Sequence, residues 1–118
     1  AMGFPDESFD LVLQSTCFTS IVDPGMKRRV AAEILRVLKP GGSVLWYDFH
    51  RSRPSPDVRP IGRDEIRALF PGCTADLETV TLDPALALRW VPRSWILCEV
   101  LEKLPFLCTH TLGWIRKP

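Results

Sequence analysis

Polar side chains stand at the ends of two apolar stretches in this sequence. The first group follows Phe9–Leu13 and consists of Gln14, Ser15, Thr16, Cys17 and Phe18. The second group closes the stretch that begins at Ser43 and consists of Asp48, Phe49 and His50. Ligands bind at the carboxyl ends of strands in open parallel sheets, so both groups are candidate site residues if the two stretches are neighbouring strands.

His50 and Asp48 have the residue types of a general base. An imidazole can accept a proton near neutral pH, and a nearby carboxylate can orient its ring. The alternative interpretation is an exposed histidine in a basic loop, because residues two apart at a strand end do not have to meet. For Gln14, Ser15 and Thr16, the alternative role is capping and loop hydrogen bonding.

Arginines and aromatic residues provide further candidates, each with a structural alternative. Arg51, Arg53 and Arg59 would attract an anionic substrate, but a charged run of this kind is usually a solvated loop. An acceptor pocket or a partner surface would use aromatic side chains, although core packing is their commoner role. The aromatic candidates are Trp90, Trp95, Trp114 and Phe106. We interpret His110 as structural.

The elements that position the first two groups form a strand–helix–strand unit. Asp23 followed by Pro24 is an N-cap signal, and apolar residues at Val30, Ile34 and Leu38 predict a helix packed on one side. Its basic residues, Lys27 among them, fall mostly on the other face. Lys39-Pro40-Gly41-Gly42 ends the helix, and a strand over 43–49 follows directly. Short links of this kind imply a right-handed crossover and a parallel strand pair.

The remainder of the chain predicts an α/β ending. A loop over 50–60 precedes a short helix over 63–70, an outer strand over 76–82 and a helix over 92–104. The stretch 108–116 predicts a last strand, antiparallel because only a short return precedes it. The length of 118 residues suits a single domain over 1–118.

Composition narrows the function classes. A net charge of +1 gives no electrostatic argument for nucleic acid, and no apolar run approaches the length of a membrane span. Cys17, Cys73, Cys98 and Cys108 are scattered without a C-x-x-C pair, which argues against zinc and favours free thiols in a reducing cytoplasm.

Two segments together resemble class I S-adenosylmethionine-dependent methyltransferases of the type 11-like group. Phe4-Pro5-Asp6-Glu7-Ser8-Phe9-Asp10-Leu11-Val12 is similar to the segment that leads into their fourth strand. Glu33-Ile34-Leu35-Arg36-Val37-Leu38-Lys39-Pro40-Gly41-Gly42 is similar to the segment that joins the next helix to their fifth strand. The resemblance implies a truncated Rossmann-like sheet, mostly parallel, with helices packed on it. It also implies an antiparallel last strand between the fifth and sixth.

The resemblance also implies a cofactor and a substrate class. In the family, residues placed as Gln14 to Phe18 border the methionine part of S-adenosylmethionine, and those placed as Asp48 to His50 face a small-molecule acceptor. The family holds its cofactor mainly by a glycine-rich turn after the first strand, and no G-x-G-x-G occurs here. We therefore expect the C-terminal half of the fold, without its first three strands, and a chain that does not bind the cofactor alone.

A non-catalytic binding or interaction module is the alternative function. Without the first three strands, Asp10–Ser15 becomes an apolar edge strand, which invites pairing with another chain. We expect a homodimer joined through this strand, edge to edge or by swapping. A complementary N-terminal half from another polypeptide is the other candidate partner.

Overall fold

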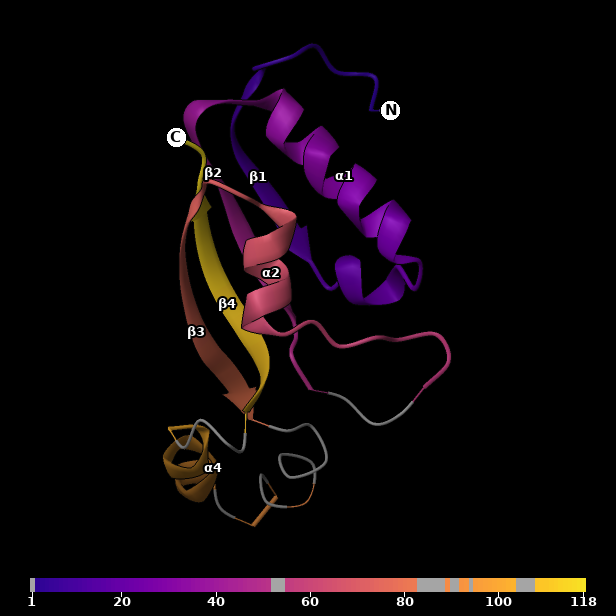
Figure 1. Ribbon diagram of the computed structural model, residues 1–118. Coiled ribbons are helices and arrows are strands. Elements are labelled where there is room, and N and C mark those ends of the chain that lie inside the picture. Colours follow the sequence, from indigo (N-terminus) through magenta and orange to yellow (C-terminus); the bar gives the residue numbers. More distant parts are fainter. Residues whose placement is uncertain (1, 52–54, 83–88, 90–91, 94, 104–107) are drawn as a thin grey trace.

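A four-stranded mixed sheet organises the molecule (Figure 1). The computed structural model describes residues 2–118 apart from 52–54, 83–88, 90–91, 94 and 104–107. The strands are β1 (Phe9–Ser15), β2 (Leu38–Phe49), β3 (Thr74–Leu82) and β4 (Cys108–Arg116). The helices are η1, a 3₁₀ turn (Phe18–Ser20), α1 (Pro24–Val37), α2 (Arg63–Leu69) and α4 (Trp95–Glu102).

The strand order is β1-β2-β4-β3. β1 pairs with β2 in parallel, whereas β4 is antiparallel to both β2 and β3, so three strands share one direction and β4 opposes them. This order confirms the predicted fold class, including the parallel pair and the antiparallel last strand inserted between its neighbours. The outer strand predicted over 76–82 is β3, which begins two residues earlier, at Thr74.

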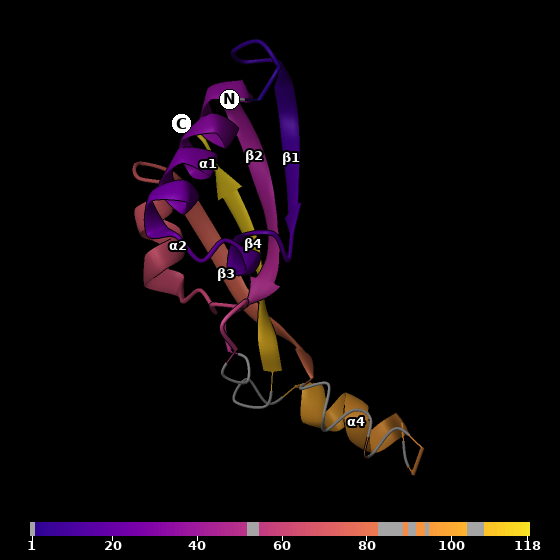
Figure 2. The same cartoon turned by 90° about the vertical axis from the view of Figure 1, so that its right-hand side faces the viewer.

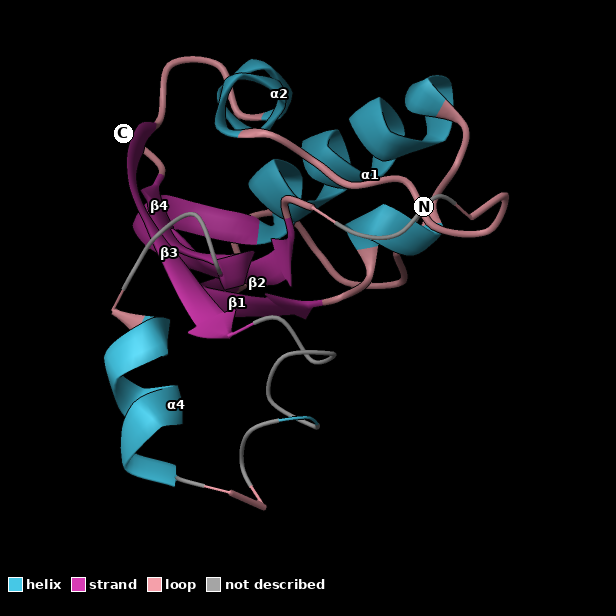
Figure 3. Cartoon of the chain, turned by 90° about the horizontal axis from the view of Figure 1, so that it is seen from below, coloured by secondary structure: helices cyan, strands magenta, loops and turns pink. Residues whose placement is uncertain are grey.

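Both α1 and α2 cover the same face of the sheet (Figures 2 and 3). The core lies between them and the strands, where burial of apolar surface supplies most of the stabilisation. Trp46 of β2 is its largest fully buried side chain, and its ring lies 4.8 Å from that of Phe18 and 6.1 Å from that of Phe70. The turn η1 therefore packs on the sheet through Phe18.

The opposite face of the sheet carries exposed apolar side chains. Leu13, Leu45 and Trp114 are neighbours in register across β1, β2 and β4. Leu13 is 66% exposed and Trp114 is 43% exposed. The expectation of core packing is therefore wrong for Trp114, and also for Trp95 of α4, which is 63% exposed. Trp90 and Phe106 lie outside the described residues.

The start of α1 follows from its cap, and its predicted polar face needs one correction. The Asp23 carboxylate accepts the N–H groups of Gly25 and Met26, each at 3.1 Å, and Pro24 occupies the first turn.

Lys27 is not on a solvated face, because only 2% of it is exposed. Its Nζ lies 3.5 Å from Glu65 Oε1, so α2 covers this lysine and supplies a carboxylate.

The segment Lys39–Gly42 does not separate helix from strand as predicted. β2 already begins at Leu38, immediately after α1, and Leu38 pairs with Phe9. Gly41 adopts φ +78°, and a Cβ on Gly42 would lie 2.8 Å from the Lys39 carbonyl oxygen. Position 41 therefore favours glycine because its backbone is left-handed, and position 42 because the backbone of the same strand leaves no room for a Cβ.

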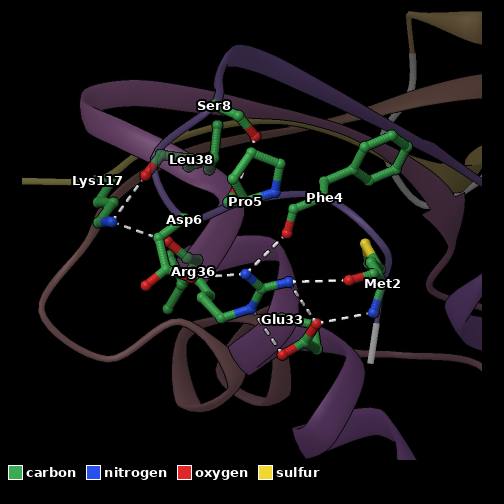
Figure 4. A network of polar contacts seen from close by, with 10 residues as sticks. Met2, Phe4, Pro5, Asp6, Ser8, Glu33, Arg36, Leu38 and Lys117 are labelled. Carbon is green, nitrogen blue, oxygen red and sulfur yellow. Dashed lines mark hydrogen bonds and ion pairs between the residues drawn. The ribbon is translucent and has the colours of Figure 1, made fainter.

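The Arg36 guanidinium joins the two sequence segments of the resemblance (Figure 4). It donates to Glu33 at 3.0 and 2.9 Å, to Asp6 Oδ1 at 2.6 Å, and to the carbonyls of Phe4 at 2.9 Å and Met2 at 3.1 Å. These bonds lower the pKa of Glu33 to about 2, mainly through Arg36 and then through the Met2 N–H. The arginine therefore holds the segment before β1 against the last turns of α1.

The end of the chain also contacts α1. Lys117 Nζ donates to the carbonyl oxygens of Leu35 and Leu38, each at 2.8 Å. The last carbonyls of a helix lack hydrogen-bond partners within the helix and carry partial negative charge. The lysine ammonium therefore supplies hydrogen-bond donors and a favourable positive charge at this end of α1. β4 and α1 are thereby joined at the same end of the molecule.

Candidate functional site

The carboxyl ends of β1 and β2 meet at one edge of the sheet. Gln14 and Ser15 lie opposite Trp46 and Tyr47 in the parallel register. The chain then turns sharply, because Thr16 has φ +53° while its N–H donates to the Tyr47 carbonyl at 2.8 Å. The two groups predicted from sequence, at Gln14 to Phe18 and at Asp48 to His50, are therefore brought together.

The turn after β1 is shaped by Gln14. Its Oε1 accepts the N–H of Cys17 at 2.8 Å, which assigns the amide orientation and directs Nε2 elsewhere. Gln14 is only 4% exposed, and within the described part of the chain Nε2 has no hydrogen-bond partner. A buried amide donor is thus left unsatisfied beside an exposed Ser15 and Thr16.

Thr16 holds a backbone conformation that its side chain disfavours. A β-branched residue in the left-handed region costs about 1–2 kcal/mol relative to the right-handed one. Such strain persists only where surrounding structure holds the chain. Here the surrounding structure consists of the β2 carbonyl before the turn and the buried residues Phe18 and Thr19 after it.

Phe18 does not offer its ring to a ligand. The side chain is 1% exposed and packs on Trp46 within the core. Cys17, by contrast, is an exposed free thiol. Of the group predicted to border a cofactor, Ser15, Thr16 and Cys17 face outward, whereas Gln14 and Phe18 are buried.

The Asp48 carboxylate is fully buried and bonds to the turn η1. Oδ2 accepts the N–H groups of Phe18 at 3.1 Å and Thr19 at 3.2 Å. Oδ1 accepts the Thr19 hydroxyl at 2.6 Å and the N–H of Phe49 at 2.9 Å. Among the described hydrogen bonds, none joins Asp48 to His50, so the pair of base and orienting carboxylate does not form in this arrangement.

His50 instead contacts the start of β4. Its backbone N–H donates to the Thr109 carbonyl at 2.9 Å, and its ring hydrogen-bonds to the backbone of His110. Its Nδ1 is buried and has no hydrogen-bond partner among the described residues. Burial lowers the pKa of His50 below its ordinary value, the bond to His110 opposes this shift, and the charges of Arg51 and Arg63 lower it further.

His110 lies beside this group although the sequence interpretation made it structural. Its ring stacks on Tyr47 with a centroid distance of 4.8 Å and lies 4.1 Å from Phe49. Nδ1 bonds to the Thr109 hydroxyl at 2.9 Å. Burial lowers the pKa of His110, while the Asp48 charge raises it. The register of β4 on β2, Phe49 opposite His110, is the signal that would have placed it here.

Four buried side-chain polar atoms lack a hydrogen-bond partner among the described residues, and all lie toward this edge. They are Gln14 Nε2, Trp46 Nε1, His50 Nδ1 and Thr111 Oγ1. Gln14 pairs in register with Trp46, and Thr111 pairs with Asp48. Buried polar groups in native proteins nearly always have a hydrogen-bond partner, so each of these atoms is a candidate contact for a ligand or a water molecule.

The arginines of the loop after β2 fit the interpretation of a solvated charged loop better than that of a substrate site. Arg51 and Arg59 are exposed, and Arg53 lies outside the described residues. The Arg59 N–H nevertheless donates to the Thr19 carbonyl at 2.8 Å, so the loop is joined to η1 through its backbone. Ile61 likewise donates to the Phe49 carbonyl at 3.0 Å.

Within the described ranges, no group of three or more His, Cys, Asp or Glu side chains is arranged to hold a metal ion. Cys17 and Cys73 are free thiols. None of the described helices has the length and apolar character needed to cross a membrane.

The fold described above is methyltransferase-like. Residues 1–46 match the family model described as "Methyltransferase domain". That range contains both sequence segments of the resemblance and the first site group. The resemblance to class I S-adenosylmethionine-dependent methyltransferases is confirmed. No curated protein matches the chain.

Solved structures with this fold include several methyltransferases. A SAM-dependent methyltransferase from Methanosarcina mazei aligns over 99% of this chain and 63% of its own, with a TM-score of 0.69 and 15% identity. The [4+2]-cyclase SpnF aligns over 100% and 54%, with a TM-score of 0.62 and 22% identity. A Haloferax volcanii methyltransferase in complex with the Trm112 activator aligns over 99% and 57%, with a TM-score of 0.63 and 20% identity.

The chain thus spans between about half and two thirds of the length of these solved structures. At these identities the similarity shows a common Rossmann-like fold. Reaction, substrate and partners have to be argued from the residues of the edge.

Proposed function

We propose that this chain forms the methionine-side and acceptor-side wall of a methyltransferase that uses S-adenosylmethionine and methylates a small molecule. The observation that supports this best is Gln14, which lies near the carboxyl end of β1 beside β2 and has a buried Nε2 without a partner among the described residues. This edge follows the segment that matches the methyltransferase family. In related sheets, the same edge is where ligands bind.

The residues present fit one end of the cofactor. Gln14 Nε2 is a donor in need of an acceptor, and a carboxylate such as that of a methionine moiety provides one. Ser15, Thr16 and Cys17 are the exposed members of the turn that would border this end. The glycine-rich turn that holds the nucleoside end in the family has no counterpart in the sequence, so we propose that this chain alone binds weakly.

When bound, S-adenosylmethionine supplies an electrophilic methyl group on its sulfonium. The task of this chain is then to orient the acceptor and to take up its proton. His50 suits the second task, because burial lowers its pKa and so favours the neutral ring that can accept a proton. Asp48 does not fit a role as the orienting partner of His50, since its oxygens are already bonded to η1.

Binding at Gln14 is tested by titrating the chain with S-adenosylmethionine and S-adenosylhomocysteine while recording its amide NMR resonances. We expect shifts at Gln14, Thr16 and Cys17 at millimolar ligand. Gln14→Glu is the matched variant: it keeps an acceptor for the Cys17 N–H but replaces the donor at Nε2 with an oxygen. This variant should lose the response while retaining the turn. An unresponsive wild-type edge at saturating ligand would exclude a cofactor site in this chain.

The reaction itself needs a separate test, because one structure with this fold is named as a cyclase. Transfer of a labelled methyl group from S-adenosylmethionine, catalysed by the longest natural chain that contains these residues, distinguishes methyl transfer from cofactor binding without transfer. His50→Gln should lower the rate while leaving cofactor affinity unchanged. Equal rates in wild type and variant would remove His50 from the proposed mechanism.

A second proposed function is an interaction module. β1 occupies one end of the strand order, and its Leu11 and Leu13 are 50% and 66% exposed. We propose that Asp10–Ser15 pairs with the same strand of a second copy, or with a complementary N-terminal half carried by another polypeptide. One structural neighbour is a methyltransferase in a complex with an activator, which supports partner binding as a use of this fold.

Solution mass at high micromolar concentration tests the homodimer. Leu13→Lys places a charge on the exposed apolar face and should shift a dimer toward monomer, whereas Arg28→Glu, at an exposed position of α1, should not. A wild-type monomer throughout would leave the complementary half as the remaining partner. We propose a cytoplasmic location, because the cysteines are scattered without a C-x-x-C pair and this spacing suits thiols in a reducing compartment.

A further inference from the structure

We propose that Asp48 is a positioning residue: its carboxylate fixes the backbone of Phe18 and Thr19, and through them the geometry of the ligand-facing turn 14–17. The first part stands on the hydrogen bonds alone. The second part rests on the proposed cofactor site. Both differ from the catalytic pairing with His50 that the sequence suggested.

The donor set around Asp48 is the central observation. Its two oxygens receive three backbone N–H groups, from Phe18, Thr19 and Phe49, together with one hydroxyl. An ionised carboxylate is an acceptor at both oxygens, so it matches four donors without conflict. Asp48 is 0% exposed, so water does not supply replacement acceptors.

An asparagine at position 48 would not match the same donors. With its NH₂ group at the Oδ2 position, the amide would face the N–H groups of Phe18 and Thr19. With the amide flipped, the NH₂ group would face the N–H of Phe49. Either orientation opposes donor to donor, although the side-chain volume is unchanged. The site therefore requires a carboxylate rather than any polar residue of this size.

The position of η1 decides the shape of the turn before it. Residues 14–17 are held at one end by the pairing of Thr16 with the Tyr47 carbonyl and at the other by Asp48. Between these points lie the left-handed Thr16 and the bond from the Cys17 N–H to Gln14. Release of Phe18 and Thr19 would let the turn relax, and the orphaned Gln14 donor would lose its fixed direction.

The experiment compares Asp48→Asn with the wild-type chain by amide NMR and hydrogen exchange. We expect the Phe18 and Thr19 amides to shift and to lose protection by about tenfold or more, because both become unpaired donors. Thr19→Ser keeps the hydroxyl and should retain wild-type protection. Ile66→Val, at a buried position of α2, serves as the control for general destabilisation and should leave these two amides unshifted.

Cofactor affinity gives the second readout. In Asp48→Asn, the affinity for S-adenosylhomocysteine should fall by at least the same factor as the exchange protection of the Thr19 amide. In Ile66→Val, the affinity should not fall. Unchanged Phe18 and Thr19 amides in Asp48→Asn would overturn the proposal, whatever the ligand does. A wild-type chain that ignores the ligand would overturn the proposed function and the second part of this inference, and the amide result would still decide the first part.

Discussion

Arg36 and Glu33 form a bidentate pair one turn apart on α1, with Nε–Oε1 at 3.0 Å and Nη2–Oε2 at 2.9 Å. Arg36 also donates to Asp6, which lies in the segment before β1. Arg36 and Glu33 belong to one of the two family-like sequence segments, and Asp6 belongs to the other. The hydrogen bonds of Arg36 therefore join the two segments in the folded chain. A guanidinium with five donors in a fixed plane can satisfy carboxylates and carbonyls together, which explains why an arginine stands there.

The pKa of Glu33 predicts how stability depends on pH. Its value is lowered from 4.5 to about 2 in the folded chain, so the unfolded chain binds a proton first as the pH falls. The stabilisation from Glu33 is complete above about pH 5 and is lost progressively toward about pH 2. Urea unfolding across this window should show that Glu33→Gln removes part of the acid dependence. Identical slopes for variant and wild type would contradict the assignment.

Replacement of Arg36 by lysine should release the N-terminal segment. Lysine keeps the charge, but all three of its N–H donors are on one nitrogen, so it does not reach Glu33, Asp6 and the Phe4 carbonyl together. We expect a lower Tm and faster proteolysis before β1. Arg28→Lys, at an exposed position of the same helix, should change neither quantity.

The buried Lys27 predicts an asymmetry between two substitutions. Lys27→Met fills the same space without a charge and should leave the free energy of unfolding unchanged or slightly higher, because Glu65 remains partly in water. Glu65→Gln should lower it by about 1–2 kcal/mol, since the buried ammonium loses its counter-charge. Denaturant titration of both variants measures the difference. Equal losses in the two variants would contradict this asymmetry and would mean that the ion pair itself stabilises the fold.

Glycine substitutions test the junction between α1 and β2. Gly42→Ala places a Cβ 2.8 Å from the Lys39 carbonyl oxygen and should cost about 1–3 kcal/mol. Gly41→Ala places alanine at φ +78° and should cost about 1 kcal/mol. Gly62→Ala meets nothing within 4 Å and should stay within about 0.5 kcal/mol of wild type. A reversed order would show that the chain relaxes at Gly42.

Local signals in the sequence were reliable where the chemistry is local. The Asp23-Pro24 start of α1 involves residues two and three apart, and the cap forms as predicted. Strand order was also predictable, because short links and the resemblance leave few arrangements. The junction at Leu38 was missed, since pairing with Phe9 extends β2 back through a proline and two glycines.

Contacts between distant segments were the part that sequence did not provide. Lys27 is buried because α2 lies over it, and the apolar spacing within α1 does not predict where α2 packs. The sequence predicted that the ends of two strands lie side by side, and they do, yet Asp48 bonds to Thr19 rather than to His50. Thr19, His110 and Thr111 enter the site through register and through η1, which depend on how separate strands align.

Both ends of the chain lie at the opposite end of the sheet from the candidate site (Figure 1). β1 alone has 7 residues, so a polypeptide or label attached before it begins about 20 Å or more from the carboxyl edge. A fluorophore at either terminus would therefore report the loosening of the Arg36 and Lys117 contacts and stay silent to ligand at Gln14. For a sensor of binding, the dye belongs on the exposed Cys17 thiol, after removal of Cys73, Cys98 and Cys108.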